Sequence, residues 1–306
     1  MNNRDMLKNE LIENNNNEKY ISDKEKLDYY SRLFKAYVKK NKVKRFIYQY
    51  LEGDGNELLS KFFNVYSSSR ICFELYSWLA NEENIDDIEF EYHLPSMRSS
   101  SNIKLRGSNM DVYYVIGNNI YFIESKFTEA LNNKNNIIPD AFYKERGIAK
   151  SQNGIPLNSD LYYRFSDNGI LVRLFPNFVE DVIGYIELYG DSTQDWFDVR
   201  QEVAHLFGIC QYIYKNQKKV NNTRIHFYNV VYDFKDDISL LAVLFRNRVE
   251  KLMEEYIELL KLRISFEYDY KYMQDIYKDI PDDKLAFGSD MTVKEILSKY
   301  FKLDNR

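Results

Sequence analysis

The pattern of apolar and polar positions predicts a β-sheet in the first half of the chain. Residues 88–94, 110–116 and 120–127 are rich in β-branched and aromatic side chains, which favour strands. Gly117-Asn118 stands between the last two ranges, and this pair suits a two-residue turn with positive φ. We therefore expect a hairpin there, and a further buried strand over residues 225–232.

Apolar residues three and four positions apart predict helices around these strands. The clearest pattern covers residues 196–214, where Val199, Val203, Leu206 and Cys210 share one face. Further helices are expected over three ranges: 23–50, 58–80 and 240–263. Three other ranges are less regular: 169–175 and 182–188, which fit a strand or a helix, and 132–158, which is polar and loop-like.

The chain divides into a polar tail, a basic helical segment and one main domain. Residues 1–22 are rich in Asn, Glu and Lys with almost nothing apolar to bury, so we expect them to be disordered. Residues 23–57 are predicted to form an N-terminal helical appendage. Residues 58–306 are predicted to form a single domain, because no repeat and no Gly/Pro-rich linker interrupts them.

The composition argues against several classes of protein. No apolar run approaches the ~18 residues that span a bilayer, and the charged start lacks the apolar stretch of a signal peptide, so we expect a cytoplasmic protein without a membrane partner. Cys72 and Cys210 are too few for a disulfide scaffold and are expected in the core. No pair of histidines has zinc-ligand spacing, and no glycine-rich loop indicates ATP binding.

Charge lies in blocks along the chain. The net charge of −5 by itself argues against a protein coated in nucleic acid. However, residues 29–51 hold seven bases and no acid, whereas residues 52–91 hold ten acids and two bases. The blocks predict a polarised surface, on which a small basic patch binds phosphates in a salt-sensitive way.

Two groups of basic side chains are candidates for binding a nucleic acid. Spacings of three and four put the first group on one face of the expected helix 23–50: Arg32, Lys35, Lys39 and Lys42. This group is equally consistent with an ordinary solvated helix face. The second group lies in an acid-free, Ser-rich loop ahead of the hairpin: Arg98, Lys104 and Arg106.

The predicted hairpin brings two carboxylates together. If Gly117-Asn118 is the loop, paired residues have numbers that sum to 235, so Asp111 lies directly opposite Glu124. Opposed Cβ atoms are about 5 Å apart, close enough for both carboxylates to hold one divalent cation. Strand alternation returns Lys126 to the same face, where its ammonium group would stabilise a phosphoryl transition state and position the attacking water.

An ordinary cross-strand ion pair on the surface is the alternative interpretation of Asp111, Glu124 and Lys126. The neighbouring positions argue against it, because both strands are nearly all apolar around the three charged residues. This composition is typical of a strand covered on both faces. Buried charges must be paired, bound to metal or functional, so the sequence favours a metal site.

Three segments of the chain resemble a known family. They are Glu124-Ser125-Lys126-Phe127-Thr128-Glu129, a helix carrying Gln201, His205, Leu206, Gly208 and Ile209, and the Tyr-rich strand that ends Val231-Tyr232-Asp233. Together with a preceding helix that carries Glu74, they resemble the PD-(D/E)XK nuclease superfamily. More narrowly, they resemble a bacterial family of restriction-endonuclease-like proteins with an E-S-K-F-T-E motif. The resemblance spans roughly residues 70–270.

This resemblance implies an α/β fold with a restriction-endonuclease-like core, in which helices flank a central mixed sheet. It implies hydrolysis of DNA phosphodiesters with Mg²⁺ or Mn²⁺, in restriction, defence or DNA processing. Asp111, Glu124 and the backbone carbonyl of Ser125 would hold the metal, Lys126 would be the catalytic lysine, and Glu74 would contact the metal through water or orient the lysine. Gln201 matches a glutamine that related nucleases place near the site. Met110 stands where the motif has proline, a position without a chemical role.

Two other functions stay open from the sequence. One is a scaffold or nucleic-acid-binding subunit that keeps the fold without turnover, against which the intact set of charged residues argues. The other is an RNase, because the same chemistry cuts either backbone. Many nucleases of this superfamily form homodimers, and the helix 240–263 would serve as an interface or equally as part of the core.

Overall fold

A five-stranded mixed sheet is the centre of the molecule. The computed structural model describes residues 3–13, 18–39, 42–52, 58, 61–95, 108–127, 168–189, 197–235 and 237–301. Within them, the sheet has the order β3-β4-β5-β6-β7. Its strands are β3 (Ile85–His93), β4 (Asn109–Ile116), β5 (Asn119–Lys126), β6 (Thr223–Val231) and β7 (Ile264–Tyr272). The first three run antiparallel, and β5, β6 and β7 run parallel, which confirms an α/β fold with a mixed sheet flanked by helices.

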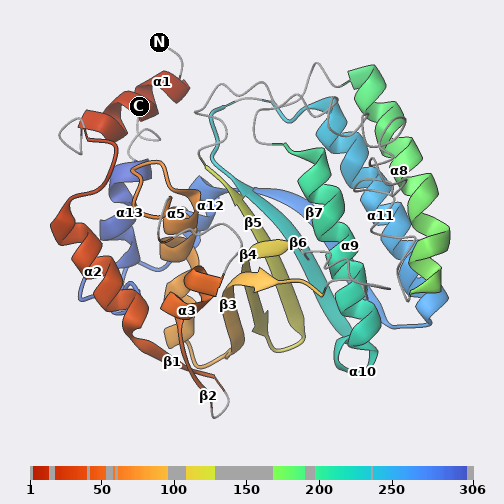
Figure 1. The fold of residues 1–306 in the computed structure, drawn as a ribbon, viewed down its shortest axis with the longest axis horizontal. Helices are drawn as coiled ribbons and strands as arrows, with labels where there is room; N and C mark the ends of the chain where they lie inside the picture. Colours follow the sequence, from red (N-terminus) through yellow and green to blue (C-terminus); the bar gives the residue numbers. More distant parts are fainter. Residues whose placement is uncertain are drawn as a thin grey trace, which may run out of the picture.

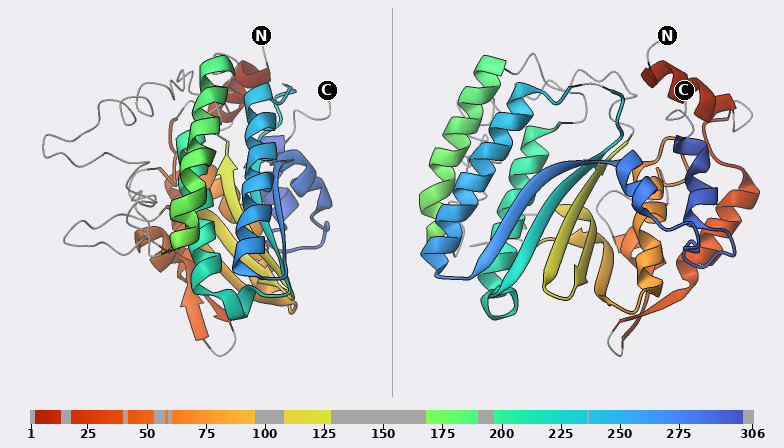
Figure 2. Two further views of the ribbon diagram at one scale, coloured as in Figure 1. Left: turned by 90° about the vertical axis from the view of Figure 1, so that its right-hand side faces the viewer. Right: turned by 180° about the vertical axis from the view of Figure 1, so that it is seen from behind.

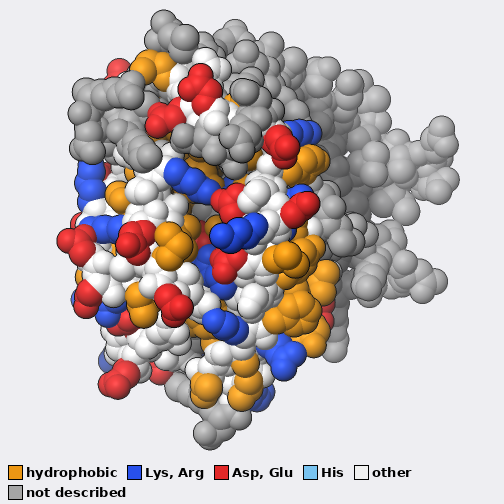
Figure 3. All heavy atoms as spheres, turned by 90° about the vertical axis from the view of Figure 1, so that its left-hand side faces the viewer, with side chains coloured by type: hydrophobic (Ala, Val, Ile, Leu, Met, Phe, Trp, Pro, Cys, Tyr) orange, Lys and Arg blue, Asp and Glu red, His pale blue; other side chains and the backbone are white. Residues whose placement is uncertain are grey.

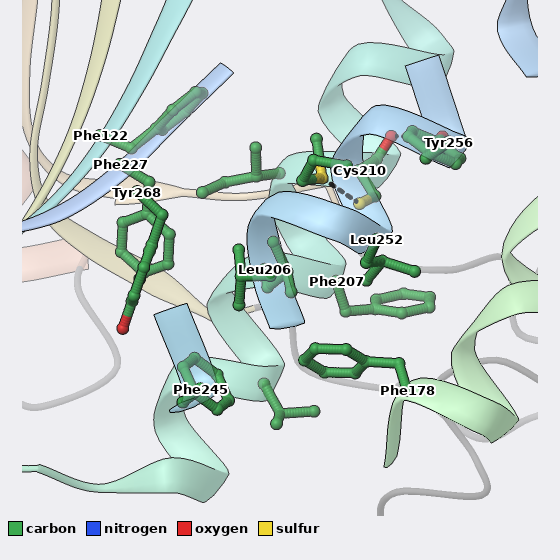
Figure 4. Packing of buried hydrophobic residues seen from close by; sticks show 14 of the residues in the cluster. Phe122, Phe178, Leu206, Phe207, Cys210, Phe227, Phe245, Leu252, Tyr256 and Tyr268 are labelled. Atoms are coloured by element: carbon green, nitrogen blue, oxygen red, sulfur yellow. Dashed lines mark hydrogen bonds between the residues drawn. The ribbon is translucent and has the colours of Figure 1, made fainter. Parts of the chain in front are cut away.

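Three long helices cover one face of the sheet: α8 (Gly169–Tyr189), α9 (Val199–Lys215) and α11 (Leu240–Leu260) (Figure 1). The short helix α10 (Gln217–Val220) follows α9 and leads into β6. Apolar side chains of α9 and α11 pack onto rings that project from the sheet, such as Phe122, Phe227 and Tyr268 (Figure 4). The predicted stripe of residues 196–214 is buried as expected, with Cys210 at its centre. We call this cluster the α9 core.

The opposite face of the sheet carries a second core built from both ends of the chain. It is formed by α1 (Asn3–Glu13), α2 (Asp23–Phe34), α3 (Phe46–Glu52), α5 (Ser68–Tyr76), α12 (Met273–Asp279) and α13 (Val293–Phe301). Figure 2 shows these red, orange and dark blue elements side by side, away from the green and light blue helices. The 3₁₀ helix η1 (Ser77–Asn81) joins α5 to β3. We call this cluster the α5 core.

The N-terminal part differs from the sequence prediction in two ways. Disorder was expected over residues 1–22, but the structure has α1 there, because Leu7 and Leu11 lie one turn apart and are buried in the α5 core. A continuous helix was expected over residues 23–50, but α2 ends at Phe34 and an antiparallel hairpin follows.

This hairpin joins β1 (Ala36–Lys39) to β2 (Lys42–Arg45) and leads into α3. A buried Tyr37 packs flat on Phe46, with ring centroids 4.4 Å apart. The expected basic helical appendage is therefore a helix, a hairpin and a short helix that share a core with α5.

Other elements follow the sequence with one shortened helix, one merger and one addition. A helix was expected over residues 58–80, but residues 61–66 form turns and an isolated bridge, and α5 begins only at Ser68, because Ser67 caps it by accepting from the N–H of Arg70. The irregular ranges 169–175 and 182–188 belong to the single helix α8. The strand β7 was not predicted, because its alternating Tyr, Glu, Asp and Lys residues resemble an exposed acidic segment. Within the described residues, no helix is long and apolar enough to cross a membrane. The loop predicted over residues 132–158 lies outside the described residues.

Candidate active site

The β4–β5 hairpin has the register that the sequence predicts. Gly117 opens the two-residue turn with a φ of +54°, and Ile116 pairs with Asn119. The pairing continues in constant register to Val112 and Ile123, one step before Asp111 and Glu124. Asp111 and Glu124 therefore stand at the end of the paired stretch, one on each strand.

Beyond the pair of Val112 and Ile123, the side chain of Asp111 accepts a hydrogen bond from β5 in place of a backbone carbonyl of β4. Its Oδ2 accepts a hydrogen bond from the backbone N–H of Ser125 at 2.6 Å. Backbone groups alternate in direction along a strand, and the carbonyl of Lys126 points to β6, where it accepts from the N–H of Tyr232. The Ser125 carbonyl therefore faces the β4 side, toward Asp111.

Lys126 is held in a buried ion pair beside these groups. Its Nζ lies 2.6 Å from Glu124 Oε1, and both side chains are almost completely buried. Gln201 from α9 links them, since its Oε1 accepts from Lys126 Nζ at 2.5 Å and its Nε2 donates to Glu124 Oε1 at 2.7 Å. Asp198 caps the start of α9 by accepting from the N–H of Gln201, which fixes that residue over the sheet.

His205 lies one turn further along α9 and faces the other oxygen of Glu124. Its Nε2 is 3.1 Å from Glu124 Oε2, and the side chain is buried. Neither ring nitrogen makes a well-aligned hydrogen bond within the described part of the chain. Gln201 and His205 are four positions apart in α9, so they lie on the same face of the helix. The face is buried because α9 lies directly over β5 and β6.

The two predicted carboxylates have opposite electrostatic surroundings. Burial raises the pKa of Asp111, and repulsion by the Glu124 and Glu91 carboxylates raises it further, well above its ordinary value. Burial also raises the pKa of Glu124, but Lys126 and His205 outweigh it and lower this pKa to about 2. The pKa of Glu124 is therefore lowered and that of Asp111 is raised, so a cation bound between them would favour the ionised form of Asp111.

Glu91 is a third acid at the site that the sequence did not single out. The pairs Phe90–Val112 and Tyr92–Met110 flank it in constant register, so Glu91 lies across from Asp111 on the neighbouring strand. Its φ is +49°, a left-handed conformation that is strained for a residue with a Cβ atom. The only signal in the sequence was an acid within a strand pattern, which by itself indicates a solvated position.

A buried polar layer lies behind Lys126 and His205. Glu202 Oε2 accepts hydrogen bonds from Asn229 Nδ2 and from the Tyr268 hydroxyl, both at 2.9 Å. Burial raises the pKa of Glu202 to about 7, although His205 and Asn229 act against the shift. These three residues were not predicted, because each looks like an ordinary helix or strand residue until the layers are packed.

Glu74 does not belong to this site, contrary to the prediction. Its two carboxylate oxygens accept from Arg32 Nη1 at 2.6 Å and Arg32 Nη2 at 2.7 Å, and both side chains are only 1% exposed. This fork-to-fork pair occupies the carboxylate, so Glu74 has no group to offer a metal or Lys126. Arg32 is correspondingly no candidate for nucleic acid.

The other predicted nucleic-acid contacts have different positions. Lys35 is exposed, and its Nζ donates to the carbonyl of Gly288. Lys42 is exposed in β2. The backbone of Lys39 is in β1, but its side chain lies outside the described residues, and so do three whole residues: Arg98, Lys104 and Arg106.

The donor set of the site fits a hard divalent cation. Asp111, Glu124 and the Ser125 carbonyl supply only oxygen, the ligand that Mg²⁺ and Mn²⁺ prefer. Burial and the neighbouring Glu124 and Glu91 carboxylates raise the pKa of Asp111, and a bound cation would offset both effects. Among the described residues, no three side chains of His, Cys, Asp or Glu form a group that could hold a metal ion. The site therefore rests on two carboxylates and a backbone oxygen.

No protein-family model, curated protein or solved structure matches this chain. Its own residues and their contacts therefore carry the statements about function that follow.

Proposed function

We propose that the protein is a metal-dependent nuclease of restriction-endonuclease-like architecture that hydrolyses phosphodiester bonds in DNA. The observation that carries this proposal is the buried Lys126 ammonium, held by Glu124 and Gln201 beside Asp111 at the point where β4 and β5 separate. A lysine fixed next to an acidic pair combines the two charges that phosphoryl transfer needs: one to hold a cation and one to stabilise the phosphate.

Asp111, Glu124 and the Ser125 carbonyl would hold Mg²⁺ or Mn²⁺, which would polarise the phosphate and acidify water. Lys126 would donate from Nζ to a phosphate oxygen and orient the attacking water. Gln201 would keep that ammonium in place, since its amide accepts from Lys126 and donates to Glu124.

Burial strengthens these interactions. Glu124 and Lys126 are 3% and 6% exposed, so little solvent screens the field at Nζ. The pKa of Asp111 is raised by burial and then by its acidic neighbours, and a bound cation would oppose this shift by favouring the ionised form. The affinity for metal should therefore increase with pH, because the proton on Asp111 competes with the cation.

A cleavage assay with Mg²⁺ or Mn²⁺ tests the proposal. We expect the chain to cut DNA, and Lys126→Ala and Glu124→Ala each to abolish most of the activity. Lys284→Ala is the matched control, because that lysine forms a partly exposed ion pair with Glu82. Equal cleavage by the parent and both site variants would refute the assignment.

Two further measurements separate the alternatives. Calorimetric titration with Mn²⁺ reports binding without turnover, and a chain that binds no Mn²⁺ and cuts nothing would be a non-catalytic scaffold. If the chain cleaves RNA but not DNA, and both variants lose this activity, the assignment of the site stands and the substrate is RNA.

A further inference from the structure

The β1–β2 hairpin presents two exposed valines on its outer face. Val38 pairs directly with Val43, and they are 73% and 69% exposed, among the four highest values of the large exposed apolar side chains in the described residues. Alternation puts Ala36 and Arg45 on the same face. Exposed apolar pairs of this kind are costly in water unless something binds them.

The inner face attaches the hairpin to the edge of the main sheet. The Tyr37 hydroxyl donates to the carbonyl of Ile88 at 2.6 Å, and Lys44 Nζ donates to Glu89 Oε1 at 2.7 Å. Both contacts are on β3, and Ile88 is three residues from Glu91, about 10 Å along a strand. The hairpin therefore lies next to the edge strand that faces Asp111 (Figure 1).

The charge of the hairpin is entirely positive. Residues 39–45 contain five bases, and no acid occurs from residue 29 to residue 51. Lys44 is paired with Glu89, whereas Lys42 and Arg45 are exposed and have no ion-pair partner within the described ranges. In Figure 3, apolar and basic side chains lie next to each other at the lower end of the face, over the hairpin.

We infer that this hairpin is a ribbon that enters a groove of duplex DNA, with Lys42 and Arg45 on phosphates and Val38 and Val43 against base edges. The inference rests on the proposed nuclease function and names its substrate as double-stranded. A two-stranded β-ribbon fits the width of the major groove, where thymine methyl groups offer apolar contacts. Single strands are instead bound by exposed aromatic platforms, and the outward pair here is aliphatic.

A second copy of the chain is the competing occupant, and charge argues against it. Two hairpins meeting through their outer faces would bring Arg45 of both copies together with no acid of the hairpin between them. A phosphate backbone supplies the missing negative charge. The valines then make contacts in the groove rather than with another protein surface.

Binding to a short duplex tests the ribbon in full-length chain that carries Lys126→Ala, without divalent metal, over a series of salt concentrations. We expect Lys42→Gln/Arg45→Gln to reduce the slope of log affinity against log salt by about 2, one for each phosphate contact. Val38→Ser/Val43→Ser should weaken binding about tenfold at every salt concentration and leave the slope unchanged. Lys218→Gln/Lys251→Gln removes two exposed charges elsewhere and is the control.

Hydrolysis of a small activated phosphodiester, bis(p-nitrophenyl) phosphate, by chains with an intact Lys126 separates the ribbon from the catalytic proposal. We expect the hairpin variants to keep this activity while losing duplex binding. If the chain does not hydrolyse this substrate but its duplex binding depends on the hairpin, the nuclease proposal is refuted and the ribbon proposal stands. Unchanged duplex binding in both hairpin variants, equal competition by a single strand, or a change from dimer to monomer in Val38→Ser/Val43→Ser would overturn the ribbon.

Discussion

Glu74 and Glu124 are both buried glutamates with a cationic partner, but they lie in different cores and only Glu124 is part of the candidate active site. Glu74 lies in the α5 core, where Arg32 binds both of its oxygens and Arg32 Nε also donates to the carbonyl of Phe287 at 2.8 Å. Glu124 shares one oxygen between Lys126 and Gln201, and its other oxygen faces His205.

The comparison shows that the partner, rather than burial, decides what a buried carboxylate can do. A planar guanidinium matches a carboxylate with two parallel hydrogen bonds and leaves it no free direction. Burial lowers the pKa of Arg32, but Glu74 outweighs this and raises it above its ordinary value, so the pair stays charged. An ammonium group is a point donor that leaves room for a second ligand on the carboxylate.

The largest expected effect is on stability, from breaking the first pair. Glu74→Gln leaves the buried Arg32 with only the Asp28 carboxylate, 3.9 Å away, as a counter-charge, and we expect a loss of about 3–5 kcal/mol in the free energy of unfolding. Urea unfolding measures it, and Glu82→Gln, in a partly exposed pair with Lys284, is a control that should lose under about 1 kcal/mol. Lost activity with unchanged stability would instead return Glu74 to the catalytic site.

Breaking the second pair should affect catalysis most. Lys126→Met keeps the apolar stem and removes the ammonium group, so we expect DNA cleavage to fall by about 10²–10³-fold. Gln201 still donates to Glu124, which limits the structural change. Steady-state cleavage rates at saturating Mg²⁺ measure the effect, and a fall of less than threefold would contradict the role of Lys126.

Glu202, a third buried glutamate, should make the stability of the folded chain depend on pH. Its pKa is raised from 4.5 to about 7, so the folded chain keeps a proton that the unfolded chain releases between these values. Stability from this group is therefore full below about pH 4.5, falls as pH rises to about 7 and then levels off. The total change is about 3 kcal/mol.

Glu202→Gln should remove this dependence, because an amide oxygen can still accept from Asn229 and Tyr268. Urea unfolding of parent and variant at several pH values measures it. We expect the variant to gain stability relative to the parent as pH rises. A constant difference between the two chains across this range would show that Glu202 does not titrate there.

The smallest expected effect comes from the amide that links the pair. Gln201→Ala frees Lys126 to move while both charges remain, and we expect kcat to fall about tenfold with little change in KM. Gln217→Ala, at the start of the short helix α10 that follows α9, is the control. Equal loss in both variants would indicate a general effect on the helix instead.

The hairpin of the site was predictable because its geometry is local. Gly117-Asn118 sets the turn, the turn sets the register, and the register determines the neighbours of Glu124. The spacing within β5 then gives the position of Lys126. The position of Gln201 was harder to predict, because α9 is distant in sequence from the β4–β5 hairpin, and only the family resemblance placed this residue near the site.

Glu74 could not be placed correctly because its partner is distant in sequence. An acid at the edge of an apolar helix stripe looks the same whether it faces a metal or an arginine 42 positions away. The hairpin of residues 36–45 was likewise not predictable, because the stacking of Tyr37 on Phe46 depends on contacts with the edge strand β3, which is distant in sequence. The position of the Glu91 side chain depends on a left-handed backbone conformation, which the residue type does not predict.

The contact between Arg32 and Phe287 has a consequence for how the chain is made. The α5 core joins α2 to residues near the C-terminus, through this bond and through the ion pair of Glu25 with Lys299 at 3.0 Å. During synthesis the strand that carries Glu124 and Lys126 emerges long before these closing residues. A ribosome that stops after α12 would therefore release a polypeptide that exposes apolar side chains of the α5 core and the Arg32 guanidinium, which makes it a substrate for chaperones and proteases.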